Sequence, residues 1–239
     1  PAPVARGLYR VADRLLPVSF SKVSMDYKLR HFLLGLDLAF PRAHASWRNI
    51  FSAAERRELM QPQWRELADS PEADPYRPFE PHYAAVSGCH YLDQASYVDI
   101  KTWLADDILV KVDRATMAHS LESRAPLLDH RLVEFAAGLP PSWKLKRLRT
   151  KHLFKQSQRG RLPNWVLDGK KRGFNAPVSQ WLAGPLRGFA KGALASARLR
   201  DYVRPEIVTR LWQQHDAGRR DNGLKLFGLV CLALWLNQR

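Results

Sequence analysis

The sequence predicts a mainly α-helical protein. Ser52 followed by Glu55 is a capping-box pattern, in which each side chain satisfies a backbone donor of the other residue at the start of a helix. Pro205 fits the first turn of a helix, and Gly138 and Gly160 stand where helices commonly end. We find no strand–turn–strand pattern with a period of two residues and no internal repeat of fixed length.

Apolar periodicity, capping residues and helix breakers define the individual elements. The four prolines between residues 69 and 81 predict a linker or surface loop, because proline cannot continue a helix. This loop separates residues 1–80 from residues 81–239. The expected helices are 2–16, 25–38, one opening at 52, one near 82, and 97–123, 129–137, 150–159, 178–199, 205–215 and 222–236.

The composition suits a globular chain with an excess of positive charge. There are 38 Lys and Arg against 23 Asp and Glu, a formal net charge of +15, which indicates a polyanionic partner such as phosphorylated substrates or nucleic acid. The cations, Arg149 and Lys151 among them, are scattered rather than clustered, so a solvated surface explains most of them. Cys89 and Cys231 form neither a disulfide scaffold nor a metal site, and we expect Cys231 in the core and a cytoplasmic location.

A charged patch interrupts an apolar stripe within residues 97–124. In one continuous helix, the stripe has apolar residues at both ends and Asp107, Lys111 and Arg114 in its middle. Buried charges require partners, and Asp107 and Lys111 are four residues apart, so they can pair. Two interpretations stay open: a structural ion-pair network, or the wall of an anion-binding cleft. Asp113 could instead cap a second helix if the first one breaks just before it.

A corner and a basic loop follow this patch. We expect Pro126 to end the preceding helix and Asp129 to cap the next one, with Glu122 and Arg124 beside the corner. From the residue types alone, a structural role for this Glu and Arg is favoured over catalysis. The second place is the loop 169–177, in which Lys170, Lys171 and Arg172 lie between two glycines. Such a loop can close around a phosphate, and it is equally compatible with an exposed basic turn.

These features belong to an ordered series of motifs. The series resembles the C-terminal half of the synthetase domain of glutamine-hydrolysing asparagine synthetases, from about Tyr91 to the C-terminus, while residues 1–80 match only loosely. The motifs are WLxDDxLxKxDRxTMA at 103–118, LExRxPLLD at 121–129, LP at 162–163, KKxGFxxP at 170–177 and WL at 181–182.

The resemblance implies the helical portion of an α/β adenine-nucleotide α-hydrolase-like (PP-loop) domain whose parallel-sheet core is largely missing from the chain. It implies a ligase that uses ATP and Mg²⁺ to adenylate a carboxylate, most often that of aspartate, and then forms an amide with ammonia. By similarity, Lys171 contacts the phosphates and stabilises the transition state, with Lys170 as the competing assignment. The remaining implied residues are Glu122, Arg124 and Asp129 for nucleotide and substrate binding, and Asp107, Lys111, Asp113 and Arg114 for a supporting ion-pair network; no metal ligand is assigned.

The chain also departs from the family pattern. The Ser-Gly-Gly-x-Asp-Ser pyrophosphate loop, the Gly-Asp-Glu-type magnesium segment and the glutaminase domain that supplies ammonia are not found in the sequence. We therefore expect an incomplete and inactive piece of a larger enzyme, which could be a homodimer, with no nucleic-acid or membrane partner. The alternatives are a related exopolysaccharide-associated amidotransferase or a β-lactam or peptide cyclase, a basic helical nucleic-acid-binding module, or a structural interaction domain.

Overall fold

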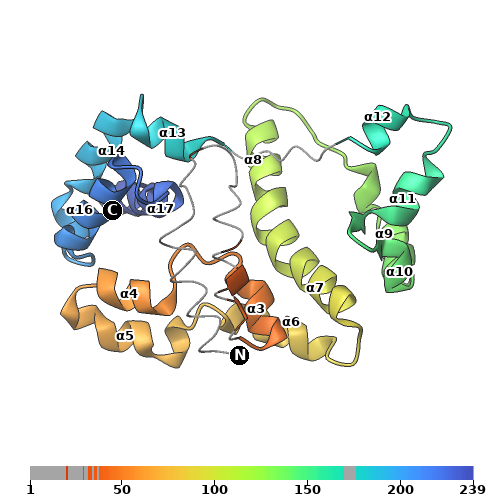
Figure 1. The fold of residues 1–239 in the computed structure, drawn as a ribbon, viewed down its shortest axis with the longest axis horizontal. Helices are drawn as coiled ribbons and strands as arrows, with labels where there is room; N and C mark the ends of the chain where they lie inside the picture. Colours follow the sequence, from red (N-terminus) through yellow and green to blue (C-terminus); the bar gives the residue numbers. More distant parts are fainter. Residues whose placement is uncertain are drawn as a thin grey trace. The chain divides into compact units, whose positions relative to one another are not determined.

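The structure is a computed structural model that describes residues 38–169 and 176–238, together with six single positions between residues 20 and 36. Its packing divides the chain into two compact units. The first comprises the described residues up to Pro78 and those from Ala176 on, and the second comprises residues 79–169. Both units are mainly helical, which confirms the predicted class (Figure 1). The helix expected at 2–16 and most of that expected at 25–38 fall outside the described residues.

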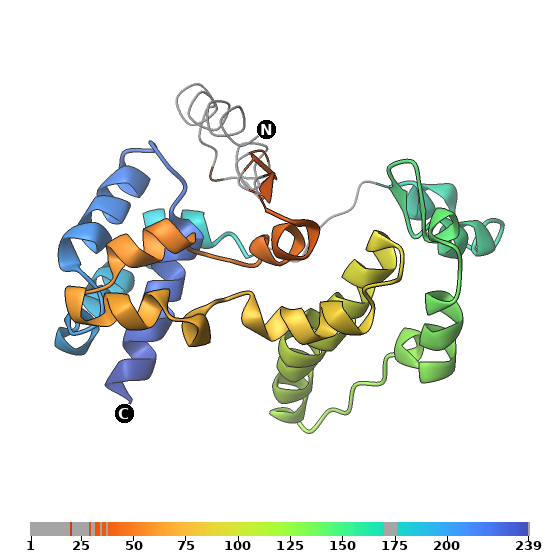
Figure 2. The ribbon, with the colours of Figure 1, turned by 90° about the horizontal axis from the view of Figure 1, so that it is seen from below.

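The first unit is built from short N-terminal helices and a longer C-terminal group. Figure 2 shows α4 and α5 lying against the C-terminal helices. The elements of this unit are α3 (Phe40–Ser46), α4 (Ala53–Leu59), η1 (Pro62–Trp64), α5 (Arg65–Asp69), η2 (Pro71–Ala73), α13 (Val178–Ala183), α14 (Arg187–Leu194), α15 (Ala197–Arg200), α16 (Pro205–Asp216) and α17 (Gly223–Asn237).

The core of the first unit surrounds α17, the most apolar helix of the chain. Leu226, Leu229 and Ala233 are at most 3 % exposed and pack against α13, α14, α15 and α16. Burying such side chains stabilises the unit, at about 1.5–3 kcal/mol for each leucine-sized group. The expected core helix at 222–236 is therefore confirmed. Cys231, expected in the core, is exposed because it lies on the opposite face of the same helix.

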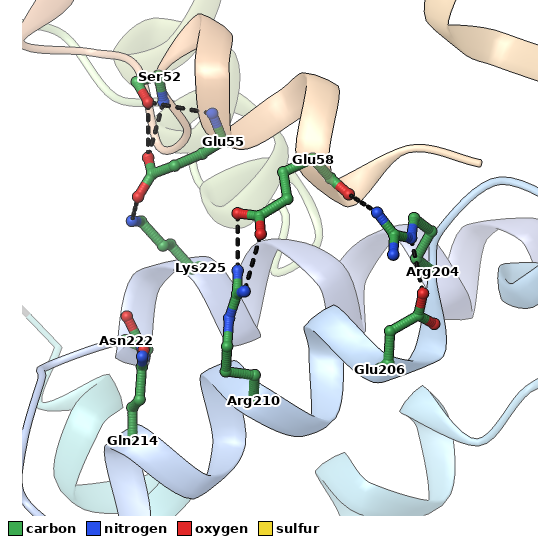
Figure 3. A network of polar contacts seen from close by, with 9 residues as sticks. All are labelled: Ser52, Glu55, Glu58, Arg204, Glu206, Arg210, Gln214, Asn222 and Lys225. Carbon is green, nitrogen blue, oxygen red and sulfur yellow. Dashed lines mark hydrogen bonds and ion pairs between the residues drawn. The ribbon is translucent and has the colours of Figure 1, made fainter. Parts of the chain in front are cut away.

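The predicted capping box is formed at the start of α4. Ser52 Oγ accepts from the backbone N–H of Glu55, and a carboxylate oxygen of Glu55 accepts from the backbone N–H of Ser52 at 3.0 Å. The other carboxylate oxygen accepts from Lys225 Nζ on α17, and Glu58 is paired with Arg210 on α16 at 2.7 Å (Figure 3). The residues that open α4 thus also hold it against α16 and α17.

A buried polar cluster fixes the turn between α16 and α17. His215 is fully buried, with Nε2 3.1 Å from the backbone oxygen of Ser179, and its Nδ1 accepts from the backbone N–H of Asn222 at 3.3 Å. Asn222 Nδ2 donates to the backbone oxygen of Leu211 at 2.9 Å, which satisfies a carbonyl of α16. Gly223 is required next to it, since an added Cβ would lie 2.2 Å from Ser179 Oγ.

The second unit is a long helical rod followed by a cluster of short elements. Figure 1 shows α7, η4 and α8 as one continuous rod. The elements are α6 (Glu80–Ala85), α7 (Tyr91–Asp99), the π-helix η4 (Ile100–Leu109), α8 (Val110–Met117), η5 (Pro126–Leu128), α9 (His130–Ala137), α10 (Pro141–Lys144), β1 (Leu145–Lys146), β2 (Arg149–Thr150), α11 (His152–Ser157) and α12 (Asn164–Leu167); η3 (Arg77–Phe79) lies at the boundary of the units.

The rod differs from the single α-helix expected at 97–123. Its middle ten residues form a π-helix, in which hydrogen bonds span five residues instead of four. At the start of this segment, Thr102 Oγ1 donates to the backbone oxygen of Val98 at 2.7 Å. The rod ends in a Schellman-type turn around Ser120, which adopts a left-handed backbone with φ 57°, and not at Pro126 as expected.

Three further expectations need correction. The helix expected at 178–199 is split into α13, α14 and α15; Gly184 and Pro185 interrupt it between α13 and α14, and a second break follows Leu194. The loop expected at 69–81 contains the single turns η2 and η3, and Pro81 lies in the first turn of α6, where its missing N–H costs nothing. The helix expected at 150–159 is present as α11 but begins at His152, because Thr150 belongs to a hairpin of two-residue strands, which are too short to show alternation.

The packing places residues 81–239 in two units, whereas the sequence predicts one segment. The change of unit after Pro78 falls close to the predicted boundary at residue 80, but residues from 176 on pack with the N-terminal segment. Among the described helices, none is both long and apolar enough to cross a bilayer.

Candidate functional site

The charged residues that the sequence predicts for the site lie in the second unit, as far as the structure describes them. Asp107 in η4 and Lys111 in α8 form an ion pair of 2.9 Å across one turn of the rod, with side chains 45 % and 65 % exposed. Within the described part of the chain, no ion pair joins Asp113 or Arg114 to another side chain. The structure therefore has one exposed pair here and not the expected network of four residues.

The π-helix explains why the apolar stripe is not maintained. Residues after η4 are rotated relative to a 3.6-residue repeat, so Ile100 and Arg114 no longer lie along one line. Ile100 and Trp103 are 38 % and 45 % exposed, and α8 has no buried residue. The face that we expected to run from packed core into a polar interior is thus open on this unit.

The corner after the rod has the expected capping residue. Asp129 accepts from the backbone N–H of Arg131 at 3.0 Å and from its guanidinium at 2.8–3.0 Å, and it caps α9. The hydrogen bonds from the Arg131 side chain and then its backbone hold the pKa of Asp129 below its ordinary value. Glu122 and Arg124 pair with each other at 2.6 Å in the extended segment before it. The pairing leaves both side chains at the surface, and their predicted binding roles stay predictions.

Most of the basic loop lies outside the described residues. Lys170 and Lys171, the predicted phosphate contacts, lie outside the described residues, as do the next four positions. The structure describes the segment that leads to this loop. This segment ends in α12 and Asp168, two residues before Lys170.

A polar cavity of about 310 Å³ lies directly upstream of that loop. Its walls are the hairpin of β1 and β2, helix α11 and the end of α12. We call it the basic pocket and define it by Leu148, Arg149, Thr150, His152, Lys155, Gln156, Arg159 and Asp168.

The charges of the basic pocket are unequally distributed. Arg159 forms two hydrogen bonds of 2.8 Å with Asp168 and a third of 2.8 Å with the side-chain oxygen of Asn164. The hydrogen bonds from Arg159, together with the charges of Arg159, Arg149 and Lys155, hold the pKa of Asp168 below its ordinary value. Among the described residues, no hydrogen bond or ion pair engages the side chain of Arg149 or Lys155. The pocket therefore has an excess of positive charge.

The sequence pattern does not predict this pocket. Arg149 is among the cations expected on a solvated surface, and no motif distinguishes His152, Lys155, Arg159 or Asp168. A signal was present, because the segment 144–151 contains five cations within eight residues. Arg149 comes to line a pocket only because the hairpin turns this segment back towards α11. The sequence pattern does not reveal that hairpin.

The described part of the chain contains no cluster of side chains that could hold a metal ion by itself. In that part of the chain, no three His, Cys, Asp or Glu side chains come together as a metal site. The Asp107 carboxylate already pairs with Lys111, and the Asp168 carboxylate with Arg159.

The order of these elements can be compared with known protein families. The family model described as asparagine synthase matches residues 27–237, which is most of the chain and includes the rod, the corner and the basic pocket. The chain belongs to the asparagine synthase family. Membership confirms the resemblance that the motifs predict, and the match includes residues 27–80 of the segment that resembles the family only loosely.

Curated relatives agree with this assignment. Asparagine synthetase [glutamine-hydrolyzing] 1 of Bacillus subtilis is 33 % identical over 144 residues, which is 60 % of this chain and 23 % of the relative. A putative asparagine synthetase of Mycobacterium tuberculosis is 32 % identical over 189 residues, 77 % of this chain and 28 % of the relative. Amidase chry2 of Gibberella zeae is 33 % identical over 104 residues, 41 % of this chain and 16 % of the relative. The chain thus spans about a quarter of the length of the two synthetases, and no solved structure matches it.

Proposed function

We propose that this chain is the C-terminal helical part of a cytoplasmic ATP-dependent ligase that converts a carboxylate into an amide. The observation that carries the proposal is the asparagine synthase match over residues 27–237. The described basic pocket supports it, because the reaction generates negative charge on phosphate groups and needs cations in place to stabilise that charge.

The reaction has two steps. An oxygen of the substrate carboxylate attacks the α-phosphorus of ATP, and pyrophosphate leaves as the bond to the β-phosphate breaks. Ammonia then attacks the acyl carbon, the bond to AMP breaks, and the nitrogen loses a proton as the amide forms. Aspartate is our proposed carboxylate and glutamine our proposed source of ammonia, since the two synthetase relatives are named for these activities.

The residues that the resemblance assigns to the site have separate roles in this scheme. Lys171, with Lys170 as the alternative, is proposed to hold the phosphates during departure of pyrophosphate. Glu122, Arg124 and Asp129 are proposed to shape the corner beside the nucleotide and substrate. Mg²⁺ would neutralise phosphate charge, and no described residue of this chain is proposed to bind it.

Exposed apolar side chains support the proposal that the unit is one part of a larger domain. Phe135, Trp143 and Trp165 are 61 %, 52 % and 77 % exposed, and in the described part of this unit only Tyr83, Val98 and Leu167 are buried apolar residues. Extended apolar surface of this kind marks an interface. We propose that its partner is the nucleotide-binding α/β portion of the same polypeptide, because the chain spans only about a quarter of its synthetase relatives.

The test uses the longest polypeptide that the gene encodes, incubated with ATP, Mg²⁺, glutamine and aspartate. The proposal predicts asparagine, AMP and pyrophosphate in equal amounts. Formation of an amide from another carboxylate, with aspartate inert, would retain the reaction and replace the substrate. Absence of any carboxylate-dependent pyrophosphate release across a panel of amino and hydroxy acids would contradict the proposed function.

A further inference from the structure

The basic pocket has properties of an anion site that are independent of the loop at Lys170 and Lys171. Its three permanent cations, Arg149, Lys155 and Arg159, face one carboxylate, that of Asp168. Arg159 and Asp168 neutralise each other through paired hydrogen bonds of 2.8 Å. Arg149 and Lys155 can therefore attract an anion that enters the pocket. A concave site lined by one sign of charge concentrates ions of the opposite sign.

The backbone around the pocket is held in an uncommon conformation. Arg147, in the turn between β1 and β2, has φ 54°, and Lys151, the N-cap of α11, has φ 56°. Residues with a Cβ rarely adopt this left-handed region, and such strain is found preferentially at functional sites. The two positions flank β2, so both are needed to turn Arg149 and Thr150 into the wall of the cavity.

The third feature is the geometry of Arg159. Its guanidinium is held by Asp168 and by Asn164, which connects the end of α11 to α12. These bonds use three of the five N–H donors of Arg159 and pair its charge with Asp168, so we assign it a positioning role. It keeps α11 and α12 apart at a fixed spacing and thereby shapes the pocket in front of Lys155.

We propose that the basic pocket binds a phosphate-bearing anion through Arg149 and Lys155, with Arg159 as a positioning residue. A volume of about 310 Å³ is at the small end of ligand sites and accommodates a diphosphate group rather than a whole nucleotide. The choice of diphosphate rests on the proposed function, in which ATP carries such a group and pyrophosphate is released. The positive charge of the pocket does not depend on that function.

Two sources of the diphosphate are possible, and the measurement separates them. The 239-residue chain is titrated calorimetrically at low salt and without metal, with pyrophosphate, ATP and malonate in separate experiments. We expect one saturable site for pyrophosphate or for ATP. Pyrophosphate binding without ATP binding identifies the released product as the ligand. Binding of both, with mutual competition, identifies the phosphate tail of the nucleotide. Malonate binding as tight as either one overturns the phosphate assignment.

Matched variants locate the site. Arg149→Gln and Lys155→Gln each remove one charge from the pocket, and we expect each to weaken binding by about tenfold or more, as for loss of a charge-assisted hydrogen bond. Arg161→Gln removes the same charge from an exposed residue that does not line the pocket, and we expect less than about a twofold change because long-range effects are screened. Equal weakening in all three variants would show diffuse attraction to net charge and overturn the proposal.

A separate measurement covers the case in which a variant does not fold, which circular dichroism would reveal. Backbone amide shifts of the wild-type chain are followed during the pyrophosphate titration. The proposal expects the largest changes at Arg149, Thr150 and Lys155, and it is overturned if the changes lie elsewhere. These results stand whether or not the longer polypeptide makes asparagine, so a failure of this site and a failure of the proposed function are distinguishable.

Discussion

The guanidinium of Arg159 and the carboxylate of Asp168 are joined by two hydrogen bonds of 2.8 Å, which connect the turn after α11 to the residue after α12. Asp168 immediately precedes the basic loop at 169–177, so the pair fixes the point from which that loop departs. It also occupies the single carboxylate of the basic pocket. One contact therefore both sets the start of the loop and leaves the pocket positively charged.

Replacing Arg159 by lysine tests this structural role. Lysine keeps the charge but cannot make two parallel hydrogen bonds, so we expect the α11–α12 connection to open more often. Hydrogen exchange of the amides of residues 164–168 should become several-fold faster, with the exchange of α17 unchanged. Arg161→Lys, which alters a neighbouring surface arginine in the same way, provides the control. Unchanged exchange in Arg159→Lys would show that the pair does not hold the two helices together.

The ion pair between Glu55 and Lys225 predicts a pH dependence of stability. Burial opposes ionisation of Glu55, but the charge and hydrogen bond of Lys225, together with hydrogen bonds from Ser52, outweigh it and hold the pKa of Glu55 below its ordinary value of 4.5. Near that pH the unfolded chain therefore binds more protons than the folded one. The contribution to stability is present above about pH 4.5 and is lost as the pH falls through the folded pKa.

Urea unfolding of wild type and Glu55→Gln between pH 3 and pH 7 measures the contribution of this ion pair to the free energy of unfolding. Glutamine can still form the capping box, so the variant isolates the charge. At pH 7 we expect it to lower the free energy of unfolding by about 1 kcal/mol, after allowance for screening of a partly exposed pair. The difference from wild type should shrink towards pH 3. Glu66→Gln on α5 is the matched control, and a pH-independent difference for Glu55→Gln would rule out the ion pair as its cause.

The buried cluster of Asn222 and His215 predicts a larger loss of stability than the ion pair of Glu55. Asn222→Ala removes the donor to the backbone oxygen of Leu211 in a site where Asn222 is 2 % exposed. The carbonyl then loses a partner away from water, and we expect a loss of about 1–3 kcal/mol in the free energy of unfolding. Thermal or denaturant unfolding measures it, with Gln213→Ala on the exposed face of α16 as the control. A loss no greater than that of the control would mean that the cluster does not stabilise the turn.

The two lysines of the basic loop predict a difference in catalysis. In the longest polypeptide that the gene encodes, Lys171→Ala should lower the rate of amide formation by about two to three orders of magnitude, the usual effect of removing a group that stabilises transition-state charge. Hydrolysis of glutamine should continue, because that chemistry does not involve ATP. Lys170→Ala should have the smaller effect on synthesis. The reverse order would assign the phosphate contact to Lys170.

Local signals allowed much of the first unit to be predicted. The capping box at Ser52, the proline that opens α16 and the apolar run of α17 are each decided by a few neighbouring residues, and all three are present in the structure. The family could also be predicted, because the motifs from Trp103 to Leu182 keep their order and spacing.

The site was less predictable for two physical reasons. The π-helix η4 depends on hydrogen bonding that an α-helical period cannot reveal. The prediction that Asp107 and Arg114 share one face of the helix was therefore based on the wrong period. The basic pocket depends on a hairpin with two residues in each strand and on left-handed backbone at Arg147 and Lys151, positions at which the residue types give no warning. Charge spacing alone cannot show that Arg149 and Lys155 share a cavity.

The most direct test of the central claim follows the oxygen atoms of the substrate. If the carboxylate attacks the α-phosphorus of ATP, one of its oxygens must leave with AMP when ammonia displaces the acyl group. The longest polypeptide that the gene encodes is therefore incubated with ATP, Mg²⁺, glutamine and aspartate labelled with ¹⁸O in its side-chain carboxylate. We predict AMP that carries one ¹⁸O, equal in amount to the asparagine formed. Unlabelled AMP, or ADP and phosphate in place of AMP and pyrophosphate, would contradict the account.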